Sequence, residues 1–128
     1  MKVKEIMTKE VITVKSTDSV GYTLEKMKQY NINGTPVVDD KNCLIGMLVK
    51  ADIFRFLIAP GHIDESPVDW VMSKELISCD EDDEIIDVTK GIRKHKITSV
   101  PVEKGGKLVG IVSFEDIIDH FLEKISEI

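Results

Sequence analysis

Hydrophobic and polar positions along the chain form one pattern that occurs twice, and each copy predicts strand, helix, strand, strand, helix. Short apolar runs predict the strands, and apolar residues at helical spacing, such as Val20, Leu24 and Met27, predict the helices. The first copy is read as a strand at 11–14, a helix after the polar residues 16–19, a strand from Pro36, a turn at 39–42, a strand at 44–49 and a helix from about Asp52. The second copy is read as a strand at 76–79, a helix after the acidic residues 80–84, a strand from about Val100, a turn at 104–107, a strand at 108–113 and a helix from about Asp116.

The two copies are a tandem duplication. A shift of 65 residues aligns 3–38 with the second half at 9 identities in 36 pairs, and a shift of 64 then aligns Asp52 with Asp116. A unit of about 60 residues seldom folds well alone, so the copies are expected to share a core. We therefore predict an α/β (α+β) fold of two β-α-β-β-α repeats related by pseudo-two-fold symmetry. The expected ranges are repeat 1 at 1–59, a linker at 60–67 and repeat 2 at 68–128.

The second helix of each copy is apolar around most of its circumference. Five of the six residues at 53–58 are apolar, and residues 117–125 continue the theme with Ile118, Phe121 and Leu122. One face can pack on its own sheet, and the other needs a different cover. Packing between the repeats and a homodimer contact are both compatible with this pattern. Trp70, just before Val71 and Met72, is expected to plug the linker against the core.

Composition narrows the class of protein. The chain has 128 residues, 42% apolar and 31% charged, which is typical of a globular domain. Its net charge of −6 and 5% aromatic content argue against nucleic-acid binding, and no apolar run approaches the roughly 20 residues of a membrane span. The N-terminus lacks the apolar stretch of a signal peptide, and Cys43 and Cys79 fit neither a disulfide framework nor a zinc-ligand spacing. We expect a cytoplasmic protein with reduced thiols and no bound metal.

Charge separates the copies: residues 1–63 carry 9 basic and 7 acidic side chains, and residues 64–128 carry 8 and 16. The acidic run Asp80–Glu84 accounts for much of the difference. Carboxylates suit the positive end of a helix dipole, which is the simpler interpretation, but clustered oxygens also suit Mg²⁺ or Ca²⁺. A divalent-cation sensor is therefore one alternative function.

The most specific local motif runs from Gly110 to Asp116, where a strand ends in a hydroxyl residue and an acid follows three residues later at a helix start. A helix N-terminus favours phosphate, the Ser113 hydroxyl can donate to a phosphate oxygen, and the Asp116 carboxylate can accept from two ribose hydroxyls. The same Ser-x-x-Asp spacing also describes a capping box that satisfies only the helix itself. Spacing leaves both interpretations open.

Taken together, the motifs resemble the cystathionine β-synthase (CBS) domain, and the duplication resembles a CBS pair or Bateman module. The resemblance rests on Ile6-Met7-Thr8, on Pro36-Val37 with Pro101-Val102, and on Gly110 to Ile117, and it covers residues 3 to about 123. It implies a regulatory module that is not an enzyme, of a class that includes energy sensors. Such a module binds AMP, ADP, ATP or S-adenosylmethionine in clefts between the repeats, commonly dimerises, and controls a partner protein that the sequence does not name. The adenosine ligand is regulatory, and no catalytic cofactor is implied.

The resemblance also implies site residues. Ser113 and Asp116 match the phosphate and ribose positions, and Thr98 matches a position that lies near the phosphate. The residues matching the adenine side of that cleft are Met7, Ile12, Ile32 and Asn33. In the second cleft Asp52 matches the ribose residue, but Val49 replaces the hydroxyl, so this cleft is expected to be weaker or empty. Its adenine side would include Met72, Ile77, Ile97 and Thr98.

A third class of function is a structural adaptor that dimerises through its apolar helices and binds no ligand. An enzyme is the least expected class, because no nucleophile is paired with a base and no phosphate-binding glycine loop is present in the sequence.

Overall fold

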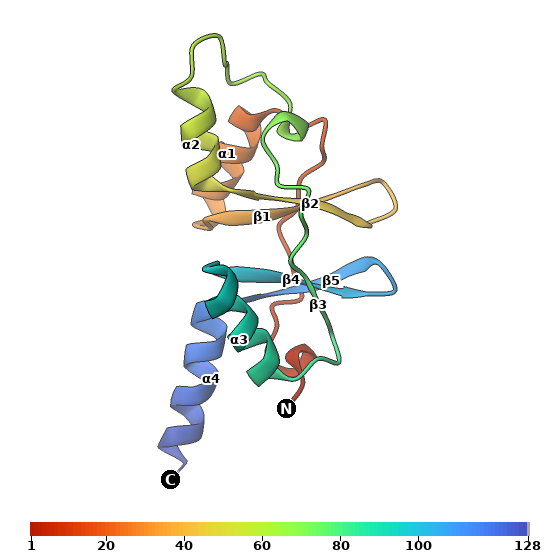
Figure 1. The fold of residues 1–128 in the computed structure, drawn as a ribbon, viewed down its shortest axis with the longest axis vertical. Helices are drawn as coiled ribbons and strands as arrows, with labels where there is room; N and C mark the ends of the chain where they lie inside the picture. The colour runs from red at the N-terminus through yellow and green to blue at the C-terminus, as the bar shows by residue number, and fades with distance from the viewer. Residues whose placement is uncertain (128) are drawn as a thin grey trace. The chain divides into compact units, whose positions relative to one another are not determined.

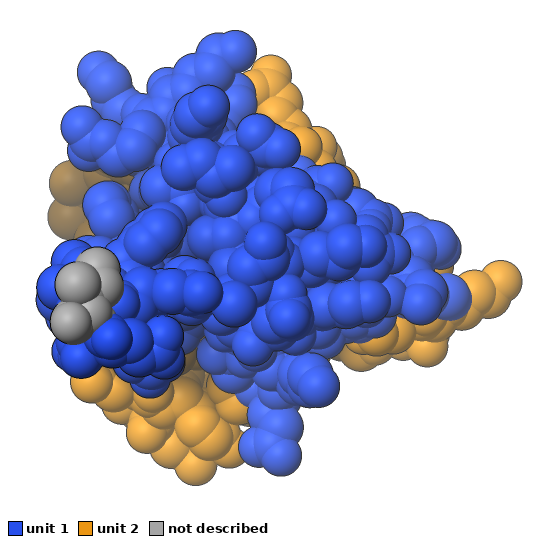
Figure 2. Space-filling model, turned by 90° about the horizontal axis from the view of Figure 1, so that it is seen from below, with its two compact units in different colours: residues 1–11, 77–128 blue, residues 12–76 orange. Residues whose placement is uncertain are grey.

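The computed structural model describes residues 1–127 and has the predicted α+β fold, with four α-helices and two small sheets (Figure 1). The chain divides into two compact units, which Figure 2 colours separately. Unit 1 contains residues 1–11 and 77–128, and unit 2 contains residues 12–76. Unit 1 therefore packs the first eleven residues of repeat 1 with most of repeat 2, and unit 2 packs the first residues of repeat 2 with the rest of repeat 1. The repeat boundaries are a prediction about sequence, whereas the units report how segments pack.

In unit 2 two helices pack on a two-stranded sheet. The elements are α1 (Val20–Tyr30), β1 (Gly34–Val38), β2 (Leu44–Val49), α2 (Lys50–Leu57) and the short 3-10 helix η2 (Val68–Trp70). β1 pairs antiparallel with β2, and a register shift lies between Val37 and Val38. Ser19 caps α1 by accepting a hydrogen bond from Tyr22 N at 3.0 Å, and Asn31 ends the helix in the left-handed conformation. The predicted strand at 11–14 is reduced to one parallel bridge between Val14 and Val37.

In unit 1 the sheet has three strands. The elements are the 3-10 helix η1 (Val3–Glu5), β3 (Cys79–Asp80), α3 (Ile85–His95), β4 (Ser99–Lys104), β5 (Lys107–Ser113) and α4 (Phe114–Ser126). β3 pairs parallel with β4, and β4 pairs antiparallel with β5. The predicted strand at 76–79 thus starts later and is shorter. Leu76 and Ile77 of the predicted run are exposed, and only Cys79 of that run, followed by Asp80, pairs with β4.

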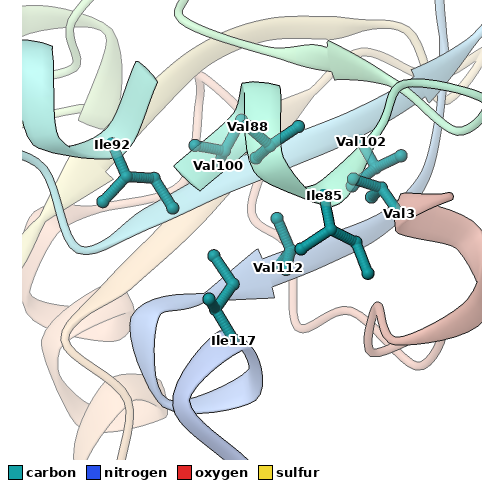
Figure 3. Close-up of a cluster of buried hydrophobic side chains, with 8 residues drawn as sticks. All are labelled: Val3, Ile85, Val88, Ile92, Val100, Val102, Val112 and Ile117. Atoms are coloured by element: carbon teal, nitrogen blue, oxygen red, sulfur yellow. The ribbon is translucent and has the colours of Figure 1, made fainter. Parts of the chain in front are cut away.

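Each unit has its own core. In unit 1 side chains from α3, β4, β5 and α4 converge with Val3 from the N-terminal segment, as Figure 3 shows. The buried residues are Val3, Ile85, Val88, Ile92, Val100, Val102, Val112 and Ile117. Unit 2 repeats the arrangement, with Val68 of η2 in the place of Val3. Both valines are fully buried, so Val3 contributes to the core of unit 1 and Val68 contributes to the core of unit 2. The expectation for Trp70 is wrong, because that side chain is 67% exposed two residues beyond the anchor Val68.

Each second helix has exposed apolar side chains, beyond those that it packs on its own sheet. On α2 only Ile53 is buried, while Phe54 is exposed. On α4 only Ile117 is buried, and the exposed large apolar residues are Ile118, Phe121, Leu122 and Ile125. No helix within residues 1–127 has the length and apolar character needed to cross a membrane.

Candidate functional site

The N-terminal end of α4 in unit 1, called its head below, brings together three of the predicted site residues. Ser113 ends β5 and serves as the N-cap of α4, where its Oγ accepts a hydrogen bond from Asp116 N at 3.1 Å. Asp116 returns the bond by accepting from Ser113 N at 2.9 Å through Oδ2. Phe114 N donates to Thr98 O at 2.8 Å, which ties the exposed Thr98 to the helix start. The capping box that the sequence left open is therefore formed.

The capping box leaves one acceptor oxygen and one hydroxyl hydrogen free to bind a ligand. In residues 1–127 no donor contacts Asp116 Oδ1, and the Ser113 hydroxyl keeps its own hydrogen, because Oγ acts only as an acceptor in the cap. Both side chains are half-buried at a helix N-terminus, where the helix dipole favours negative charge. A hydroxyl pair could donate to Oδ1 and an anion could accept from the serine without breaking the cap.

Met7 also lies in unit 1, against β5. Thr8 N donates to Ile111 O at 2.8 Å and Ile111 N donates to Thr8 O at 3.0 Å, so the N-terminal segment pairs with the strand that leads to Ser113. This pairing is possible because Gly110 has no side chain. A Cβ there would lie 2.5 Å from Met7 Sδ. Ile97, predicted for the second cleft, packs against the core of unit 1, and Ile77 is 37% exposed.

The head of α2 in unit 2 has the same backbone but different chemistry. Lys50 N donates to Asn33 O at 2.8 Å, matching the bond between Phe114 and Thr98. Val49 is the N-cap and has no side-chain hydrogen bond, and Asp52 forms an ion pair with Arg55. The two helix starts therefore differ in capping: α4 is capped by Ser113 and Asp116, and α2 has no side-chain cap.

The remaining predicted residues lie in unit 2. Ile32 packs partly buried against the core and Asn33 is exposed. Ile12 O accepts a hydrogen bond from the buried Thr35 hydroxyl at 2.6 Å. Met72 packs beside Gly46, where a Cβ would lie 2.6 Å from its Sδ, so it repeats the relation of Met7 to Gly110.

The acidic run Asp80–Glu84 is occupied by partners within unit 1. Asp82 pairs with Lys4 at 3.0 Å and Lys2 at 3.6 Å, and the Lys4 ammonium holds the pKa of Asp82 below its ordinary value. Asp83 Oδ2 accepts from Asp80 N and Asp80 Oδ2 accepts from Asp82 N, which shapes the turn before α3. Within residues 1–127 no group of three or more His, Cys, Asp or Glu side chains is placed to hold a metal ion.

Comparison with known proteins decides the family. The CBS domain family matches residues 3–59 and again residues 68–123. The chain belongs to the CBS domain family. The CBS domain-containing protein YhcV of Bacillus subtilis is 35% identical over 115 residues, which cover 90% of this chain and 81% of YhcV. A Methanocaldococcus jannaschii protein, MJ1404, is 33% identical over 95% of this chain, which spans only 32% of its length.

A solved structure shares both fold and sequence. The CBS domain pair of protein MJ0100, solved with 5'-methylthioadenosine and S-adenosyl-L-methionine, has a TM-score of 0.87 and 30% identity to this chain. The match covers 97% of this chain and 98% of that one. The predicted resemblance to a CBS pair is thereby confirmed, and the relative binds ligands of the predicted adenosine class.

Sequence reasoning missed two features of these sites. It did not foresee that Met72 lies against Gly46 and Met7 against Gly110, although a glycine inside a strand signals a close approach. It also missed that Lys26 Nζ donates to Thr13 O at 2.8 Å in unit 2, a contact that repeat 2 cannot form because Gly91 stands at the matching position.

Proposed function

We propose that this CBS pair is a regulatory module that binds an adenosine-containing small molecule at the head of α4. Asp116 would accept from the ribose hydroxyls through Oδ1, and Ser113 and Thr98 would donate to a phosphate or another anionic group. The observation that carries the proposal is the half-buried Ser113–Asp116 cap, which leaves one carboxylate oxygen and one hydroxyl hydrogen available at a helix N-terminus. The ligands of the MJ0100 pair support the adenosine class.

The adenine side is proposed from the family resemblance alone, which assigns contacts with the base to Met7, Ile12, Ile32 and Asn33. The motif at Asp52 would be the weaker one, because Val49 cannot donate a hydrogen bond and Arg55 already engages the carboxylate.

Calorimetric titration tests the proposal with S-adenosylmethionine, methylthioadenosine, AMP, ADP and ATP. The decisive variant is Asp116→Asn, which keeps an oxygen for Ser113 N but loses the charge that strengthens a bond to ribose. We expect at least one ligand to bind below millimolar and Asp116→Asn to weaken it about tenfold or more. Asp52→Asn is the matched control and should leave the stronger site unchanged. Equal ligand affinity of the wild type and Asp116→Asn would refute the proposal.

We further propose that the output is a change in self-association or in affinity for a partner protein. The apolar residues exposed on α4, including Phe121 and Leu122, support a homodimer through this helix. Sedimentation of wild type and Leu122→Glu, with and without the ligand found by calorimetry, tests this step. A monomeric wild type at all concentrations would refute the dimer and leave the ligand proposal standing.

A further inference from the structure

Unit 1 contains a groove that the nucleotide site proposed at α4 does not use; of its lining residues only Ile77 was assigned a ligand role, in the second cleft. It has a volume of about 200 Å³ and runs between the segment that enters β3 and one side of α3. Its lining includes both apolar and polar residues. The lining residues that matter here are Ser78, Cys79, Asp83, Asp87, Gly91 and His95.

The tandem duplication provides an internal comparison for this groove, because a shift of 65 residues maps each lining residue onto unit 2. There Lys26 occupies the position of Gly91. Its ammonium donates to Thr13 O at 2.8 Å and lies 5.6 Å from the centroid of the Tyr22 ring. Thr13 corresponds to Ser78, and Tyr22 corresponds to Asp87. In unit 2 the groove is therefore filled by a side chain of the protein itself.

Two donors of unit 2 have no counterpart in unit 1. Gly91 has no side chain, and a Cβ built on it has no heavy atom within 4 Å. The second donor is the Thr35 hydroxyl, which bonds Ile12 O at 2.6 Å, and Val100 replaces it. Within residues 1–127 the carbonyl oxygens of Ile77 and Ser78 therefore lack the side-chain donors that their counterparts in unit 2 have. An open volume beside two such acceptors suits a ligand that donates hydrogen bonds.

The charge around the groove specifies the sign of that ligand. Asp87 stands where unit 2 has the neutral Tyr22, and Asp83 lines the same groove. Burial, and then the charges of Asp83, Asp80 and Glu103, raise the pKa of the Cys79 thiol to about 12, so the groove disfavours a further negative charge. An anion or a nucleotide phosphate is a poor fit here.

We propose that this groove binds a small aliphatic primary amine, with its ammonium donating to the Ser78 carbonyl oxygen and facing Asp87. The alkyl portion takes the path of the Lys26 side chain of unit 2, along α3. The inference goes beyond the proposed nucleotide function and does not depend on it.

The test uses n-butylammonium chloride, which reproduces a lysine side chain from Cβ outward, in an NMR titration of the whole chain. n-Butanol is the neutral probe of the same shape, and ammonium chloride controls for ionic strength. We expect n-butylammonium to shift the amide resonances of Ser78 and Gly91 in a saturable manner and n-butanol to do so at least about tenfold more weakly, because the acceptor and the carboxylate prefer a charged donor. Equal responses to the two probes would overturn the proposal.

Variants of both units make the test sharper. Gly91→Lys supplies an internal ammonium and should abolish the response, whereas Gly91→Ala, which fits the open space, should retain it within about threefold. Asp87→Asn should weaken binding by about two- to fivefold, as expected for an exposed ion pair. Lys26→Gly should open the corresponding groove of unit 2 and add a second set of shifts around Thr13. Unchanged binding in Gly91→Lys would place the probe elsewhere and refute the assignment.

Discussion

Gly110 is the position where the structure makes its most quantitative prediction, because the N-terminal segment of unit 1 passes directly over it. In Gly110→Ala the new Cβ would lie 2.5 Å from Met7 Sδ, 2.9 Å from Met7 Cγ and 3.0 Å from Thr8 O. The sulfur can move by rotation about the side-chain bonds. The Thr8 oxygen cannot move far, because Thr8 is bonded to Ile111 through both its N–H and its carbonyl.

The magnitude follows from two opposing terms. Overpacking of this kind costs about 1–3 kcal/mol, and replacing glycine by alanine returns about 0.5–1 kcal/mol through the lower entropy of the unfolded chain. We expect a net loss of about 1–2 kcal/mol, which lowers the melting temperature by roughly 3–10 °C for a chain of this size. Urea unfolding followed by circular dichroism measures it.

Two further variants guard the interpretation. Gly91→Ala makes the same chemical change in open space within α3, so it should gain about 0.5–1 kcal/mol from helix propensity. Adding Met7→Ala to Gly110→Ala removes the two shortest contacts, so the double variant should be more stable than the sum of the single effects by more than about 0.5 kcal/mol. A Gly110→Ala protein as stable as wild type would refute the close approach on which this reasoning depends.

Three other changes follow from single side chains. Val49→Thr provides a hydroxyl at the uncapped start of α2, and calorimetric melting should show a gain of up to about 1 kcal/mol. The pKa of Cys79 is raised to about 12 from 9.0, so the folded state favours the thiol. The contribution of the Cys79 thiol to stability is then fully present below pH 9 and falls as pH rises toward 12. In a Cys43→Ser background, iodoacetamide at about pH 8 should label folded Cys79 at least about a hundredfold more slowly than unfolded Cys79. Asp82 has a lowered pKa, so its contribution exists above pH 3.8 and is lost as pH falls, and urea midpoints of Asp82→Asn should depend less on pH in that range.

The sequence predicted most of the fold because the apolar positions follow clear periods. The helix starts near Ser19 and after Glu84, the strand at 44–49 and both turns agree with the structure. The first strand of each copy was overestimated, because an apolar run does not show whether a ladder partner lies beside it. Val14 finds one bridge, and β3 extends over two residues.

The sequence alone could not predict the unit in which the segments around Val3 and Val68 pack. Val3 and Val68 align with each other in the duplication, so their equivalence was visible, but the unit in which each is buried depends on tertiary contacts. The same limit applies to Lys26 and Gly91. Their difference is evident in the aligned copies, and its consequence appears only once the Lys26 ammonium is seen on Thr13 O.

Asp116 shows why a motif of this kind cannot be divided into a structural and a functional interpretation. Its Oδ2 serves the cap and its Oδ1 has no donor among residues 1–127, so one side chain supports both roles at once. Asp116→Ala removes both and should cost about 1 kcal/mol of stability together with any ligand affinity, whereas Asp116→Asn keeps an acceptor for Ser113 N and should cost a few tenths of that. Urea unfolding and calorimetry on the same two variants therefore separate the roles. If Asn lost as much stability as Ala, the charge itself would be holding the helix start, and a drop in ligand affinity could no longer be assigned to the ribose contact alone.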